Sequence, residues 1–140
     1  MGYPIDFCQE NVSFSKKGVL RGLHYQIGKY SQAKLVKVLR GKVLDVAVDI
    51  RPDSPSYLKY TRTILDSKRH ESLFIPKSFA HGYVVLSENA LYSYKVDEIF
   101  SIENMRGISF DSKLLNIDWK ISINKLILSD KDRMHPELPL

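Results

Sequence analysis

Short apolar runs, each closed by a turn signal, are the feature that most limits how this chain can fold. The runs are rich in β-branched residues or alternate apolar with polar positions, and Gly, Pro, Asn or Ser separates one run from the next. Such a succession is typical of an all-β sandwich or barrel. The expected strands cover residues 34–40, 43–50, 57–65, 72–75, 82–86 and 90–96.

The turns between these runs refine the prediction. Gly41 separates the first two runs, so we expect residues 34–50 to form a hairpin. Helical structure is expected only as short turns, at residues 76–80 and near residues 111–115. The pattern as a whole predicts an antiparallel jelly-roll barrel, whose mouth can hold a small ligand among inward-facing side chains.

Length and composition predict one globular domain over residues 1–140. Hydrophobic residues make up 44% and charged residues 26%, which excludes a disordered tail and a collagen-like repeat. The single cysteine, Cys8, cannot form an internal disulfide, and this suits the reducing cytoplasm. No apolar run approaches the ~20 residues of a membrane-spanning helix, and the start lacks a signal-peptide pattern. We therefore expect no membrane partner.

The net charge of +5 gives weak evidence about partners. It arises from 21 Lys and Arg residues against 16 Asp and Glu residues, and the basic residues are scattered. Their densest group, Lys16 and Lys17 with Arg21, is short and has no helical period. A nucleic-acid partner is therefore not expected.

The four histidines differ in what surrounds them. His24 shares a predicted strand face with Gln26, where it is either a structural residue or part of a ligand site. His81 precedes a strand, so it either caps a turn or lies at the mouth of the barrel. His70 and His135 lie in charged stretches and receive no role. Because no His-x-His pair occurs, we expect no metal.

The segment before His24 contains a possible bulge. In a regular strand, Arg21 and His24 point to opposite faces of the sheet. A bulge at Gly22 would turn both side chains to the same face.

Two pairs of polar residues in the predicted strands need an explanation. Tyr92 and Tyr94 share one strand face, and they either pack in the core or supply a general acid. Asp45 and Asp49 share one face of an otherwise apolar strand, where unpaired carboxylates are costly. A salt bridge at the strand edge or the orientation of a base would explain them.

Several segments together resemble the dTDP-4-dehydrorhamnose 3,5-epimerase family of nucleotide-sugar enzymes. The most specific of them is the string Arg-Gly-Leu-His-Tyr-Gln at residues 21–26. The resemblance extends in order over nearly the whole chain, through residues 7–11, 13, 15, 18–26, 32–36, 41–43, 45–49, 75–76, 79–82, 94–95, 106–108, 117–119 and 128–132. The family fold is a cupin-like jelly roll without a catalytic metal, and its members are usually homodimers.

The resemblance implies an epimerase that acts at C3, C5 or both of a nucleotide-linked 4-keto-6-deoxy sugar, with no cofactor. His24 is the implied general base, and Asp132 orients its ring. Lys34 stabilises the enolate oxygen, and Tyr94 returns a proton from the opposite face. If residues 128–132 form a strand, Asp130 lies on the same face as Asp132 and is the alternative partner of the base.

The resemblance also implies the residues that bind the substrate. Arg21, Gln9 and Asn11 are expected to hold the diphosphate and the nearby sugar, and His81 to lie in the pocket. A Tyr-Tyr pair of the family is replaced at residues 99–100, where Phe100 keeps a ring that can stack on a base.

Family members carry further strands before the position that matches Gly2. We therefore expect weaker activity or an altered dimer. Two other functions stay open, a keto-isomerase of the same fold and a non-catalytic barrel that binds a nucleotide sugar.

Overall fold

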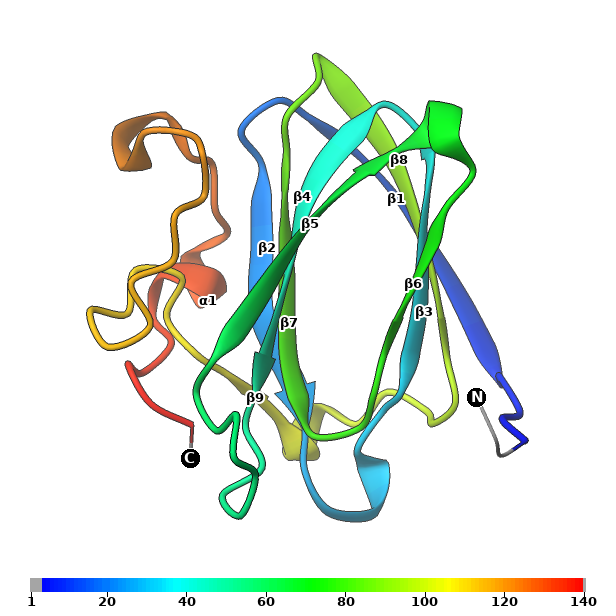
Figure 1. Ribbon diagram of the computed structural model, residues 1–140, viewed down its shortest axis with the longest axis vertical. Coiled ribbons are helices and arrows are strands. Elements are labelled where there is room, and N and C mark those ends of the chain that lie inside the picture. The colour runs from blue at the N-terminus through cyan, green and yellow to red at the C-terminus, as the bar shows by residue number, and fades with distance from the viewer. Residues whose placement is uncertain (1–3, 140) are drawn as a thin grey trace.

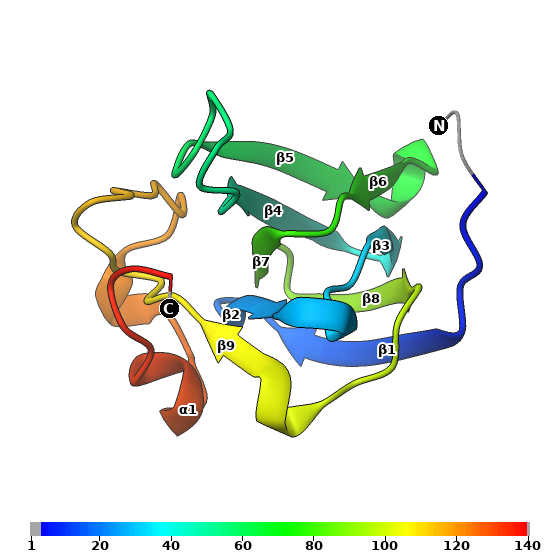
Figure 2. The same ribbon diagram turned by 90° about the horizontal axis from the view of Figure 1, so that it is seen from below.

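The computed structural model describes residues 4–139 as two antiparallel β-sheets packed face to face (Figure 1). The view from below separates the two sheets (Figure 2). One sheet has the order β1 (Gln9–Lys16), β8 (Asn89–Val96), β3 (Lys34–Arg40) and β6 (Ser72–Ile75). The other has the order β5 (Tyr60–Asp66), β4 (Lys42–Asp49), β7 (Phe79–Val85), β2 (Leu20–Gln26) and β9 (Met105–Gly107).

Within residues 4–139, helical structure is limited to single turns. Four short 3₁₀ turns cover Gly28–Tyr30, Ser67–Arg69, Ile102–Asn104 and Ile123–Lys125, and α1 covers Asp130–Arg133. Ser129 caps α1 by accepting a hydrogen bond from the Asp132 backbone N–H. None of the described helices is long and apolar enough to span a membrane.

The five-stranded sheet is covered on both faces. Its inner face packs against the four-stranded sheet through a core that includes Val36, Val43 and Tyr92. Its outer face packs against the C-terminal segment through a second core that includes Val46, Leu115 and Trp119. Because both faces of β4 are buried, its apolar residues form a near-continuous run rather than an alternation.

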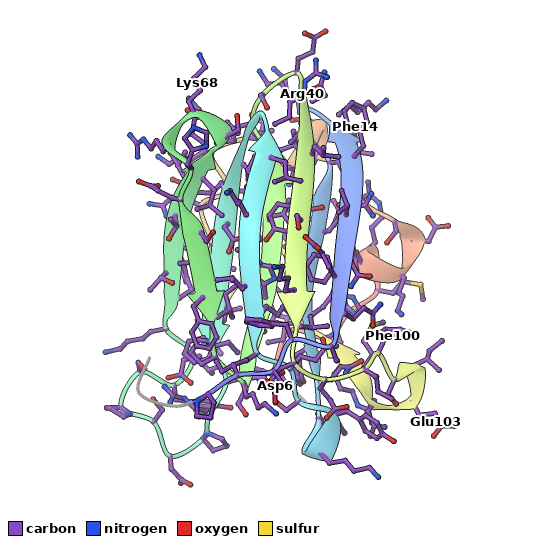
Figure 3. The ribbon with its side chains drawn as sticks, turned by 90° about the vertical axis from the view of Figure 1, so that its right-hand side faces the viewer. Asp6, Phe14, Arg40, Lys68, Phe100 and Glu103 are labelled. Carbon is purple, nitrogen blue, oxygen red and sulfur yellow. The ribbon has the colours of Figure 1, made fainter. Side chains whose placement is uncertain are left out.

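The four-stranded sheet, by contrast, leaves its outer face to solvent. It faces the viewer in Figure 3, where Phe14 of β1 lies at its edge. The Phe14 side chain is 61% exposed, and Val12 of the same strand is 55% exposed. β1 therefore carries apolar residues on the outside and, as the site shows, polar residues on the inside.

The predicted hairpin at residues 34–50 was wrong. Both strands form, but β3 pairs with β6 and β8, whereas β4 pairs with β5 and β7 in the other sheet. Gly41, at φ +86°, is the corner where the chain passes between the sheets, and a Cβ there would meet the Asn89 carbonyl oxygen. The apolar runs on either side of Gly41 thus predicted the two strands correctly, but they did not predict which strands β3 and β4 pair with.

The structure differs from the other predictions at residues 76–80, at the start of β5 and around Asp132. The segment 76–80 contains no helix, because residues 77–78 turn and β7 begins at Phe79. β5 begins at Tyr60 rather than Tyr57, since residues 52–58 form turns. The turn expected near residues 111–115 is present. The segment around Asp132 is helical rather than extended, so Asp130 and Asp132 do not share a face.

Candidate active site

Two adjoining cavities open between the sheets. Their volumes are about 300 and 370 Å³, and four residues line both, Asn11, His24, Lys34 and Tyr94. His24 comes from the five-stranded sheet, whereas the other three come from the four-stranded sheet. A ligand that fills the shared space is therefore contacted from both sheets.

A bulge in β2, which the sequence left open as an alternative to a regular strand, turns Arg21 and His24 toward this space. The pairing of β2 with β7 shifts register between these two residues, and both line the same cavity. Gly22 lies between them at φ +136°, and a Cβ there would lie 2.6 Å from the Cα of Gly82. The close approach of two strands and the positive φ both require glycine.

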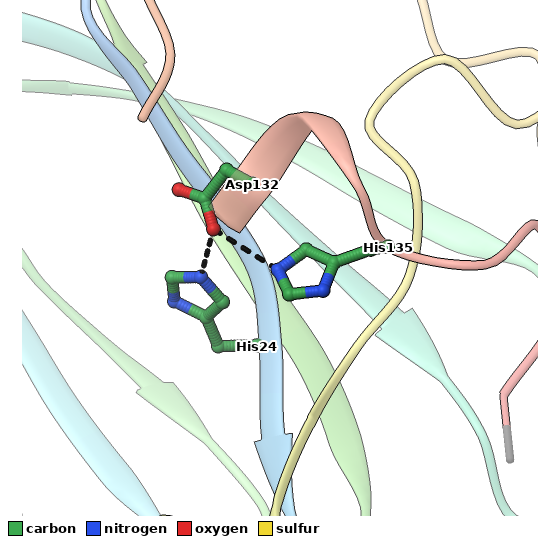
Figure 4. A group of neighbouring side chains, drawn as sticks. All are labelled: His24, Asp132 and His135. Carbon is green, nitrogen blue, oxygen red and sulfur yellow. Dashed lines mark hydrogen bonds and ion pairs between the residues drawn. The ribbon is translucent and has the colours of Figure 1, made fainter. Parts of the chain in front are cut away.

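His24 is bonded to Asp132 of α1. The His24 Nε2 lies 2.5 Å from the Asp132 Oδ1, and the Gly22 backbone N–H donates to Oδ2 at 3.3 Å (Figure 4). Burial alone raises the pKa of Asp132, but the hydrogen bonds from His24, Gly22 and His135 outweigh it and lower that pKa overall. Asp132 is thus a carboxylate near neutral pH, while Asp130 is exposed and has no part in the pair.

The C-terminal segment reaches His24 because β2 holds it in place. The Leu20 backbone N–H donates to the Ile127 carbonyl at 2.9 Å, and the Ile127 N–H donates to the Gly18 carbonyl at 2.9 Å. α1 begins three residues after this bridge. The strand that carries the histidine therefore also anchors the segment that carries the carboxylate.

Lys34 is a buried cation that lines both cavities, with a relative exposure of 9%. Burial lowers the pKa of its ammonium to about 8, although the Asp45 carboxylate opposes this change. With that pKa the ammonium remains mostly protonated at neutral pH. The site therefore contains a poorly hydrated positive charge beside the space for a ligand.

Tyr94 faces the cavities from β8 and lies directly opposite Asn11 of β1. Burial raises the pKa of the Tyr94 phenol, although its hydrogen bond with Asn11 and the nearby charge of Arg21 oppose the rise. The phenol is therefore protonated at neutral pH and can donate a proton.

A buried hydrogen-bond network links Asp45, His81 and Tyr92. The Asp45 carboxylate accepts a hydrogen bond from the Tyr92 hydroxyl at 2.6 Å, and the His81 Nε2 lies 2.9 and 3.0 Å from its two oxygens. Burial lowers the pKa of His81, although Asp45 opposes this change, so the ring tends to be neutral. Asp45 thus orients a histidine, while Asp49 forms a salt bridge with Arg51.

The other predicted residues divide between the two cavities. Gln9 and Phe100 line one with Asn11, and Arg21 and His81 line the other. His81 lies within β7, where it pairs with His24, rather than at a turn. The Arg21 guanidinium donates to the Ser15 hydroxyl at 3.1 Å. Arg21 and Gln9 therefore line different cavities.

Sequence reasoning missed His135. Its Nε2 lies 3.0 Å from the same Asp132 oxygen that His24 contacts. The i,i+3 spacing of the two residues would have indicated this contact only if the segment had been recognised as helical. It also did not predict the strand β1, whose inner face carries Ser13 and the expected binding residue Asn11 between the exposed Val12 and Phe14.

The ligand atoms of His24, Asp132 and His135 lie within 4.8 Å of one another, a spacing that could suit a metal ion. Both histidine nitrogens, however, lie against one carboxylate oxygen at hydrogen-bond distance. Ligands of a single zinc ion surround it at ~2.0–2.2 Å and do not contact one another in this way. The group is therefore best described as a carboxylate shared by two imidazoles.

Comparison with known proteins places this site in a family. The family model described as dTDP-4-dehydrorhamnose 3,5-epimerase matches residues 1–139. The enzyme of that name from Escherichia coli (strain K12) is 47% identical over 132 residues, which are 94% of this chain and 71% of the relative. The family match over residues 1–139 includes every predicted site residue, so it gives no support to the expectation of weaker activity.

Solved structures agree with the sequence match. An epimerase of the same name from Bacillus anthracis str. Ames, with TDP and PPi bound, superposes with a TM-score of 0.94 at 41% identity, covering 98% of this chain and 78% of that one. A Legionella pneumophila enzyme in complex with dTDP-4-keto-L-rhamnose has a TM-score of 0.91 at 43% identity, covering 96% and 71%. The cupin-like all-β prediction is confirmed. The chain belongs to the dTDP-4-dehydrorhamnose 3,5-epimerase family and is an epimerase.

Proposed function

We propose that this protein epimerises a dTDP-linked 4-keto-6-deoxy sugar at C3, C5 or both, through an enolate. One observation carries the mechanism: His24 and Tyr94 face a shared cavity from opposite sheets, with the Lys34 ammonium beside them. The nucleotide and the sugar class are inferred from the relatives, whose solved structures hold TDP or a dTDP-keto-sugar.

His24 is the proposed general base. The C4 ketone acidifies the C–H bonds at C3 and C5, because the resulting carbanion delocalises onto the ketone oxygen. The Nε2–H of His24 donates to Asp132, which leaves Nδ1 to accept the proton. The Asp132 carboxylate then stabilises the imidazolium that forms.

Lys34 is proposed to stabilise the enolate oxygen. Its charge is poorly hydrated before the substrate arrives, so it is not weakened by reorganising water. A single preorganised donor of this kind is worth ~3 kcal/mol of transition-state stabilisation. The buried Asp45 carboxylate favours the protonated state of Lys34, as that role requires.

Tyr94 completes the inversion. Its protonated phenol faces the sugar from the sheet opposite His24, so a proton that it donates arrives on the face opposite the one that was lost. The net reaction moves protons only, and we propose that it needs no cofactor and no metal.

The remaining side chains are proposed to bind the substrate. Arg21 carries the positive charge suited to the diphosphate, and Gln9 and Asn11 offer amides to the phosphate and the sugar. Phe100, at the rim of its cavity and 55% exposed, offers a ring to the base. His81 forms part of the wall beneath His24.

We also propose a homodimer in the cytoplasm. In the described part of the chain, β1 is an edge strand with exposed apolar side chains, and such edges favour pairing with another copy. The free thiol of Cys8 suits a reducing compartment. Light scattering coupled to size-exclusion chromatography gives the oligomeric state. A monomer at micromolar concentration would refute the dimer.

Solvent exchange tests the proposed chemistry. The protein is incubated with dTDP-4-keto-6-deoxyglucose in heavy water, and the sugar protons are followed by NMR. We expect the C3 signal, the C5 signal or both to disappear with the wild type and to persist with His24→Ala. His70→Ala, which changes an exposed histidine in a distant turn, is the matched control. Unchanged exchange in His24→Ala would refute the base, and binding without exchange in the wild type would refute the epimerase chemistry.

A further inference from the structure

His135 shares a single carboxylate oxygen with the proposed base. Its Nε2 lies 3.0 Å from the Asp132 Oδ1, and the His24 Nε2 lies 2.5 Å from that same atom (Figure 4). The two imidazoles stand nearly perpendicular, at 81°, with ring centroids 5.6 Å apart. The His135 side chain is only 10% exposed. Two donors therefore divide the negative charge of one carboxylate.

The fold leaves a specific place for the His135 ring. The ring packs on Gly107 of β9, where a Cβ would lie 2.4 Å from it. Gly107 in turn pairs with His24 across β2 and β9. On the far side, the Pro136 carbonyl accepts the Ser109 backbone N–H at 2.7 Å. The ring is thus held by backbone contacts on both sides of the residue and is not a mobile surface group.

The other charged side chains near His135 interact with groups other than Asp132. The Lys131 ammonium points to the sulfur of Met105 at 3.8 Å. The Arg106 guanidinium donates to the carbonyls of Glu103 and Met105. The Glu137 carboxylate accepts the Lys113 backbone N–H. Lys131 and Arg106 line a cavity together with His135, and Asp132 is the anion that His135 contacts.

We propose that His135 is a positioning residue that acts through Asp132 and lowers the basicity of His24. Its Nε2–H donates to the shared oxygen and draws part of the carboxylate charge away from the His24 ring. The proposal rests on the proposed function only in that His24 is the base. His135 itself does not line either cavity and does not contact the substrate space.

The physical consequence is a change in the titration of His24. Without the second donor, Asp132 places its full charge on His24, and the imidazolium becomes more stable. The midpoint of the His24 titration should therefore rise when the donor at residue 135 is removed. The base would then be protonated over more of the working pH range, and kcat/KM would fall on the acidic side.

Three variants separate the hydrogen bond from other effects. His135→Phe and His135→Leu fill space over Gly107 but have no donor. His135→Gln keeps an amide N–H near the position of Nε2 but cannot become charged. His70→Gln is the control for removing an exposed histidine. Thermal melting first shows which variants are folded.

The main measurement is an NMR titration of the His24 ring in the ligand-free protein. We expect a raised midpoint in His135→Phe and His135→Leu, and a midpoint closer to the wild type in His135→Gln. The acidic limb of kcat/KM should shift in the same order. A midpoint that is the same in all four proteins, or one that rises equally in His135→Gln and His135→Phe, would overturn the proposal.

The titration also separates this proposal from the proposed function, because it needs no turnover. A protein without epimerase activity in which the His24 midpoint still follows the donor at residue 135 would keep the coupling and refute only the catalysis. If the enzyme is active but the acidic limb of kcat/KM does not change with the donor at residue 135, the coupling is refuted and the proposed catalysis is kept.

Discussion

At the scale of single residues, the site is determined by charge states that neighbouring groups impose. Lys34 shows this most clearly, because burial lowers the pKa of its ammonium to about 8 and the Asp45 carboxylate prevents a further fall. An ammonium with this pKa is charged at neutral pH but can be titrated within the range where enzymes are assayed. Lys34 is thus the proposed electrophile, and it is also the group that loses its charge when the pH rises above about 8.

The first prediction concerns the basic limb of activity. Since Lys34 loses its charge as the pH rises through about 8, kcat/KM should fall above that pH. Lys34→Met should lower kcat about 100-fold, the equivalent of one preorganised donor. Lys34→Arg, whose guanidinium stays charged, should move the basic limb out of the measurable range even if the plateau drops. A basic limb that stays near pH 8 in Lys34→Arg would assign it to another group.

At the scale of elements, the bulge in β2 brings His24, the proposed base, into the site. Gly22 shifts the register so that Arg21 and His24 line one cavity, and the approach of Gly82 leaves no room for a side chain. The His24 and Asp132 pair then depends on backbone geometry that only glycine accepts at this position.

The second prediction therefore compares two glycines. Gly22→Ala introduces a Cβ 2.6 Å from the Gly82 Cα, and it should cost ~2 kcal/mol or more and remove most activity. Gly28 lies at φ +63°, in the left-handed region that other residues can adopt, and a Cβ there meets open space, so Gly28→Ala should cost only ~1 kcal/mol and leave activity intact. Urea unfolding and initial rates measure both. Equal losses in the two variants would contradict a role for the close approach.

The elements also show what local sequence could and could not predict. β4 and β8 were recognisable because β-branched and alternating residues fit a pleated, buried surface. The hairpin at Gly41 was wrong because apolar pattern reports burial but not the identity of the neighbouring strand. The four proposed catalytic residues followed from the resemblance and meet in space, whereas His135 escaped notice because its contact depends on one helical turn.

At the scale of the molecule, the second core has a functional consequence. The C-terminal segment packs on the outer face of the five-stranded sheet through Trp119, which is 3% exposed and donates its Nε1–H to the Phe110 carbonyl at 2.9 Å. The same segment continues to α1, where Asp132 forms its hydrogen bond with His24. Stability on one face of the sheet is thereby linked to catalysis on the other.

The third prediction follows from this arrangement. Trp119→Ala should reduce the free energy of unfolding by ~3–5 kcal/mol, as the loss of a buried indole does in other cores. Trp119→Phe should recover much of that stability, since it loses the hydrogen bond but keeps an aromatic ring. Unfolding in urea, followed by circular dichroism, gives both values. A change below 1 kcal/mol in Trp119→Ala would show that the second core contributes little.

In the proposed mechanism the two sheets also determine the stereochemistry, since the proposed base belongs to one sheet and the proposed acid to the other. The measurement that tests this account most directly is the fate of the substrate with Tyr94→Phe in heavy water. We expect deuterium to enter C3 or C5 of recovered, unepimerised sugar while epimerised product falls at least 100-fold, because His24 still removes the proton but nothing returns one to the opposite face. Epimerised product formed in the wild-type ratio to exchange would contradict the account.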